Sequence, residues 1–110
     1  METMKAIRVH SSDTIDYTPP GDLAAGSVVV QGTLIGIATR ALLAGRVEAL
    51  AIQGVFDVEK AVGAVTAGQL IYWDSAAQLA TTVVGSNTLM GKAVRGALGP
   101  DTRVRVLLTP

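Results

Sequence analysis

The sequence has no cysteine, few aromatic residues and no long apolar run. Its 110 residues include one Trp, two Tyr and one Phe, although 49% of them are hydrophobic. The absence of cysteine excludes disulfides, thiolate nucleophiles and cysteine metal sites. Val, Leu, Ile and Ala must therefore build the core, which favours packed aliphatic side chains over an aromatic-lined pocket.

The charge is balanced, with nine basic and nine acidic residues and a formal net charge of zero. A nucleic-acid-binding protein normally carries a basic excess, so we expect no nucleic-acid partner. No stretch approaches the roughly 18 apolar residues of a membrane helix, and the start, METMKAIRVHSSD, lacks the apolar run of a signal peptide. We expect one soluble domain, made in the cytoplasm, with no membrane partner.

Twelve glycines and four prolines divide the chain into segments of strand length. The sequence predicts an all-β fold, a single small barrel or sandwich of about seven to nine short strands with at most one short helix. Residues 58–66 are the candidate for that helix. The expected strands lie in the segments 6–10, 14–18, 27–32, 33–39, 46–60, 69–74, 88–94 and 102–109.

The longest patterned segment is RVEALAIQGVFDVEK, residues 46–60. Leu50, Ile52, Phe56 and Val58 share one face at a period of two, and the intervening residues form the other face. This alternation predicts one half-buried strand, although residues 48–51 also suit a helix and leave the first half open. Gly54 would then be a bulge or a close backbone approach.

Short motifs recur along the chain. The dipeptide Ala-Gly precedes a predicted strand at residues 25–26, 44–45 and 67–68, and LIGIA at 34 resembles LMGKA at 89. Each Ala-Gly predicts a tight turn in which the glycine has a positive φ. The uneven spacing argues against a solenoid. The repeated motifs are compatible with an old two-fold duplication within one barrel or sandwich.

The segment GSNTLMGKA, residues 85–93, superficially resembles a phosphate-binding loop. The intact motif has four residues between its glycines and a hydroxyl after the lysine. Here five residues separate Gly85 from Gly91, and Ala93 follows Lys92. We therefore expect a turn followed by a strand from Thr88, and no cofactor.

No set of residues predicts catalysis or metal binding. His10, the only histidine, stands beside two serines and Asp13, but adjacent strand residues point apart and cannot form a triad. Asp57 and Glu59 share a strand face and suit a solvated surface better than an acid–base pair. We expect a protein that is not an enzyme and has no metal site.

Four residues are candidates for contact with another subunit. Tyr72 and Trp73 are adjacent on a predicted strand, so one ring points into the core and the other needs a second buried surface or a partner. Arg103 and Arg105 lie on one face of the last strand. They could contact an acidic partner or pair with Asp57 and Glu59 across the sheet.

The order of several segments carries a family resemblance. DTIDYTPPGDLAAGSVVVQGTLIGIA is followed by GVFDVEKA, AGQLIYWD, NTLMGKAV and RVRVLL, and the most telling pieces are residues 16–19, 54–58 and 72–74. Over nearly its whole length the chain resembles the small capsid cement, or decoration, proteins of tailed bacteriophages and prophages, some of which have carried a recombinase label.

The resemblance implies a mostly β homo-oligomer, a dimer or trimer, on the outer surface of the virion. Such proteins bind the expanded head after their synthesis in the bacterial cytoplasm and bridge major capsid subunits against the pressure of packaged DNA. We expect residues 1–13 to form a mobile arm that orders on the capsid, and residues 14–110 to form a single β domain. The alternatives are a non-catalytic β binding module for a carbohydrate or protein ligand, and a DNA-processing enzyme.

Overall fold

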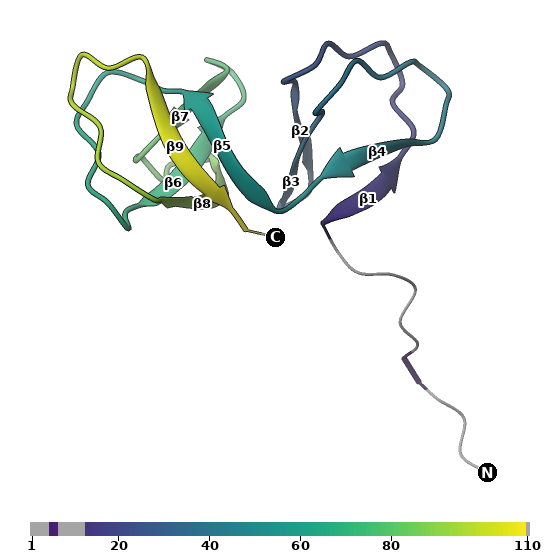
Figure 1. The fold of residues 1–110 in the computed structure, drawn as a ribbon, viewed down its shortest axis with the longest axis horizontal. Coiled ribbons are helices and arrows are strands. Elements are labelled where there is room, and N and C mark those ends of the chain that lie inside the picture. Colours follow the sequence, from purple (N-terminus) through teal and green to yellow (C-terminus); the bar gives the residue numbers. More distant parts are fainter. Residues whose placement is uncertain (1–4, 7–12, 110) are drawn as a thin grey trace.

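The computed structural model describes residues 5–6 and 13–109, and within them the protein is all-β, with nine strands and no helix. The strands form two antiparallel sheets (Figure 1). The first sheet has the order β1-β4-β3-β2 and the second the order β5-β9-β8-β6-β7. The strands are β1 (Thr14–Tyr17), β2 (Val28–Gln31), β3 (Leu34–Ile37), β4 (Glu48–Ala51), β5 (Gly54–Glu59), β6 (Leu70–Asp74), β7 (Leu79–Thr81), β8 (Thr88–Ala93) and β9 (Arg103–Leu108).

This arrangement confirms the predicted all-β class and number of strands, in a sandwich-like form without a closed barrel. The turn after Gly85 and the strand that begins at Thr88 are also confirmed. Residues 7–10 of the expected first strand, with His10, lie outside the described residues, as do Ser11 and Ser12.

The prediction of one long strand over residues 46–60 is wrong. The segment is divided between β4 in the first sheet and β5 in the second, and the chain changes direction at Gly54, whose φ is 124°. Alternation continues through the break because both strands bury apolar side chains. Ala51, predicted on the solvent-facing side of the strand, is buried, at 7% exposure.

Two other local predictions fail. Residues 58–66 contain no helix: Val58 belongs to β5, Val62 is 96% exposed, and Val65 makes an isolated bridge with Ala97. Conversely, β7 was not predicted because its three residues are too short to show a period.

The Ala-Gly turns are confirmed. Gly26, Gly45 and Gly68 have φ values of 87°, 74° and 85°, a conformation that glycine adopts without steric cost. Two of these turns are held by matching backbone bonds: Gly26 donates to the Ala38 carbonyl at 2.6 Å, and Gly68 donates to the Ala93 carbonyl at 2.7 Å. The equivalent acceptors, Ala38 and Ala93, end the repeated LIGIA and LMGKA segments.

The two sheets repeat one four-stranded unit, as the sequence motifs indicated. Strands β1, β4, β3 and β2 correspond in order and pairing to β5, β9, β8 and β6. Isolated bridges occupy equivalent places, between Leu23 and Leu42 in the first unit and between Val65 and Ala97 in the second. The main difference lies between β6 and β8, where residues 75–87 and β7 replace the two-residue turn at Gly32 and Thr33.

Each unit has its own core, and the second core extends into the first sheet. Ala38, Leu42 and Leu50 form the small core of the first unit. The larger core combines side chains of the second sheet, Trp73 and Met90 among them, with Ile35 and Ile37 of β3. The face of β3 that carries Ile35 and Ile37 therefore packs against the second sheet and joins the two sheets.

Lys60 is buried at the end of β5, at 7% exposure. Its ammonium donates to the carbonyls of Ala61, Gly63 and Gly99, at 3.2, 2.7 and 3.3 Å. These bonds tie the loop after β5 to the loop before β9, 39 residues away. The lysine thus serves as a hydrogen-bonding staple.

We expect Lys60→Met to lower the free energy of unfolding by about 1–3 kcal/mol, because three carbonyls lose a charged donor while the aliphatic stem is kept. Denaturant unfolding followed by circular dichroism measures the change. Lys92→Met is the matched control, because Lys92 is exposed on β8. Equal stability of the two variants would contradict the staple.

Candidate interaction surfaces

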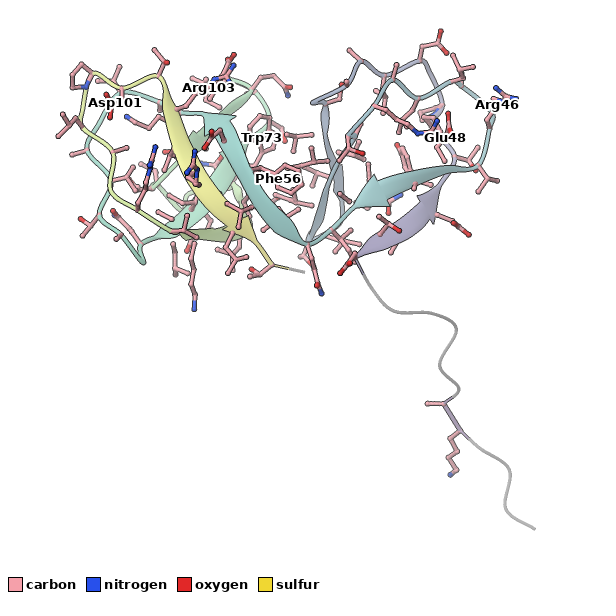
Figure 2. All side chains as sticks on the ribbon, viewed as in Figure 1. Arg46, Glu48, Phe56, Trp73, Asp101 and Arg103 are labelled. Carbon is pink, nitrogen blue, oxygen red and sulfur yellow. The ribbon has the colours of Figure 1, made fainter. Side chains whose placement is uncertain are left out.

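A cleft of about 470 Å³ lies between the two sheets. Its floor includes Val28 and Ile37 from the first sheet and Phe56 and Trp73 from the second. Figure 2 shows Phe56 and Trp73 on the side of the second sheet that faces β2 and β3. Polar groups are placed around the apolar floor by the ends of β5 and β9 and by the turn before β7: Asp57, Glu59, Gln78 and Arg103.

The structure separates the two adjacent aromatic residues of β6. Trp73 is 5% exposed and belongs to the larger core, whereas Tyr72 is half-buried on the opposite face of the strand. Trp73 therefore lies beneath the cleft and presents little of its ring to a ligand. Phe56, which also lines the cleft, is half-buried.

The two arginines of β9 have different surroundings. Arg105 forms a bidentate ion pair with Asp57 across the sheet, with Nε–Oδ1 at 2.9 Å and the second nitrogen–oxygen distance at 3.2 Å. This confirms one of the two predicted alternatives for Arg105. Arg103 lies opposite Glu59 in the register, is exposed, and makes no ion pair within the described part of the chain.

The ion pair changes the acid–base behaviour of both groups. The hydrogen bonds from Arg105 lower the pKa of Asp57 below its ordinary value, against a smaller opposing effect of desolvation, and nearby Arg95 and Arg103 add to the lowering. The same bond raises the pKa of Arg105. Because both side chains are substantially exposed, solvent screens the pair and its effect on stability is small.

We expect the Asp57–Arg105 ion pair to stabilise the protein at neutral pH and to lose this contribution in acid. A carboxyl whose folded pKa is lowered stabilises the protein above its unfolded pKa, near 3.8, and loses that contribution as the pH falls through the lower folded value. Melting curves from pH 7 to pH 2 should show wild type slightly above Asp57→Asn at neutral pH and the two converging in acid. A constant difference across this range would contradict the assignment.

A second surface lies on the solvent side of the second sheet. At one end of this side lies a mostly apolar patch that we call the outer face, formed by Val55, Leu70, Tyr72, Leu89, Lys92 and Leu107. The ion pair of Asp57 and Arg105 lies further along the same side. The aliphatic members of the outer face are well exposed, at 54% for Val55, 43% for Leu70, 45% for Leu89 and 40% for Leu107. A face with this many exposed aliphatic side chains is typical of an interaction site.

The outer face does not follow from the sequence pattern because β8 contains a register shift. On β8, Gly91 pairs with Ile71 and Leu89 pairs with Tyr72, so the intervening Met90 has no pairing partner on β6. Its side chain points into the core. Strict alternation along TLMGKA would place Leu89 and Lys92 on opposite faces. Leu70 and Tyr72, at alternate positions of β6, were the available signal.

The remaining motifs do not form a site. Lys92 is an exposed residue within strand β8 and does not belong to a loop. Among the described residues no cluster of three or more His, Asp or Glu side chains is arranged to hold a metal. No described helix has the length and apolar character to cross a membrane.

These features define a class: a small duplicated β-protein with an exposed apolar patch on one sheet and, between its sheets, a cleft with an apolar floor and a polar rim. Residues 9–108 match the family described as phage cement protein. The chain therefore belongs to the phage cement protein family, a structural family associated with the capsid of the virion. No curated protein and no solved structure matches the chain.

Proposed function

We propose that this protein binds the outer surface of the expanded head as a homo-oligomer and bridges neighbouring major capsid subunits. The family match over residues 9–108 is the observation that carries the proposal. The protein is made in the host cytoplasm and joins the shell after expansion. It performs no catalysis, and neither nucleic acid nor membrane is a partner.

The physical properties of the chain suit this role. Packaged DNA loads the shell outward, and many weak bridges resist that load together because each bound contact raises the effective concentration of the next. A net charge of zero lets many copies crowd the surface without strong repulsion. Two sheets joined by one continuous core give a rigid unit for transmitting force.

We propose that the four candidate residues contribute in different ways. Arg103 is exposed at the rim of the cleft and contacts an acidic group of the capsid, and Tyr72 contacts a neighbouring copy. Trp73 holds the two sheets together beneath the cleft. Arg105 acts through Asp57, which it fixes beside Arg103.

Co-sedimentation with two capsid preparations, unexpanded proheads and expanded empty heads of the matching phage, tests the proposal. We expect saturable binding to expanded heads alone. A folded protein that binds neither would overturn the cement role. A glycan array then tests the alternative, a non-catalytic binding module for a carbohydrate or protein ligand.

We further propose that residues 1–13 act as an arm that adds to the contact with the capsid, since chain termini commonly serve as docking elements. Deletion of residues 2–10 should weaken binding to expanded heads while the melting temperature of the β domain stays unchanged. An unchanged affinity would remove the arm from the interface.

A further inference from the structure

The repeated unit allows the outer face to be compared with its counterpart in the same molecule. Across the second sheet, Leu70 pairs with Lys92 and Lys92 with Leu107. In the first sheet, Val28, Ile37 and Ala51 occupy the corresponding positions. Val28 pairs with Ile37, and Ile37 pairs with Ala51. The next pair, Tyr72 opposite Leu89, corresponds to Val30 opposite Ile35.

In the first sheet this face is covered by protein. Ile35 and Ile37 are 1% and 5% exposed and belong to the larger core, with Val28 and Val30 packed against it. The covering residues come from the inner face of the second sheet, the face that carries Phe56 and Trp73. Among residues 5–6 and 13–109, nothing covers the equivalent face of the second sheet, and its aliphatic residues stay exposed.

The first unit lacks the complementary cover: in the part of the chain that the structure describes, no sheet packs over its own core. Tyr17 and Val29 are half-buried there, whereas their counterparts in the second unit, Val58 and Ile71, are 7% and 0% exposed. We call the half-buried residues Ile15, Tyr17 and Val29 the open rim. The described part of one chain thus has one uncovered sheet face and one incompletely covered core.

We propose that the outer face of one copy packs over the open rim of a second copy. This contact would repeat between molecules the packing that joins the two units within one molecule. It extends the proposed homo-oligomer by naming its surfaces, and it stands independently of capsid binding.

The contact uses two different surfaces, so it is heterologous, and it closes into a ring when the rotation between copies permits. Lys92 stands at the centre of the outer face, at the position of Ile37. Its aliphatic stem can pack against the rim while the ammonium reaches solvent at the edge. On the free protein the same charge discourages indiscriminate sheet association.

Sedimentation velocity and light scattering without capsids test the interface. We expect wild type to self-associate and Leu70→Lys/Leu107→Lys to weaken association at least tenfold with an unchanged melting temperature, because both positions are exposed. Val62→Lys/Leu98→Lys is the matched control: its positions are 96% and 70% exposed but lie in loops, and it should associate like wild type. A monomeric wild type, or an oligomer insensitive to the outer-face variant, overturns the inference.

Cross-linking distinguishes this contact from a symmetric one, since the chain contains no cysteine of its own. Leu70→Cys in one copy and Tyr17→Cys in another should form a disulfide between the two species when they are mixed and oxidised. Disulfides only between two Leu70→Cys copies would instead indicate that outer faces meet each other and would overturn the proposal. Capsid co-sedimentation of the same variants reports separately on the cement role.

Discussion

Gly91→Ala should destabilise the protein by about 3 kcal/mol or more, a large share of the stability of a small domain. A Cβ at residue 91 would overlap the backbone carbonyl of Leu107 on the neighbouring strand. The carbonyl belongs to the β8–β9 pairing and cannot rotate away as a side chain can, so the two strands would have to separate locally. Denaturant unfolding followed by circular dichroism gives the free-energy change.

Two other glycines provide the comparison. At Gly36, the equivalent position in LIGIA, an added Cβ meets the side chain of Leu50, so Gly36→Ala should cost less, about 1–3 kcal/mol. Gly21 has open space and no positive φ, and Gly21→Ala should change stability by less than about 0.5 kcal/mol. If Gly91→Ala were as stable as Gly21→Ala, the close approach of β8 and β9 would be wrong.

Trp73→Ala should lower the free energy of unfolding by about 3–5 kcal/mol, because the indole is buried where the two sheets meet. Tyr72→Ala, on the adjacent residue, should cost about 1 kcal/mol or less in the monomer, since the ring lies half-buried on the outer face. Loss of capsid binding in Trp73→Ala would therefore reflect unfolding. The same loss in a folded Tyr72→Ala variant would instead reflect the loss of a contact that the tyrosine ring makes at the outer face.

Trp73→Phe is the control, because it keeps an aromatic ring in the core and should retain most of the stability. Since Trp73 is the only tryptophan, its emission in the wild type reports directly on the junction between the sheets. A red-shifted emission from native protein would indicate an exposed indole. Such a result, with equal losses for Trp73→Ala and Tyr72→Ala, would contradict the placement of the two rings.

The sequence predicted the features that depend on local chemistry. The Ala-Gly turns follow from glycine's tolerance of positive φ, and the bond between Arg105 and Asp57 follows from two charged faces at matching positions of neighbouring strands. The repeated LIGIA and LMGKA segments likewise indicated the duplication that the strand order displays.

Features that depend on long-range packing were not predictable. Period-two alternation continues from Leu50 to Val58 even though the chain passes from one sheet to the other, so no signal marked the break. The outer face depends on the register shift beside Met90, which sequence alternation does not encode. The identity of the cement family came from the order of whole segments, because no individual residue carries a chemical signature.

The duplicated unit also shows where foreign sequence can be displayed. In the second unit, residues 75–87, with their own short strand β7, stand where the first unit has only Gly32 and Thr33, and the surrounding ladder keeps its strand order. The hairpin between β2 and β3 is thus a natural graft point. A peptide of similar length inserted between Gly32 and Thr33 should leave the fold intact, and an array of cement subunits would carry it in many regularly spaced copies.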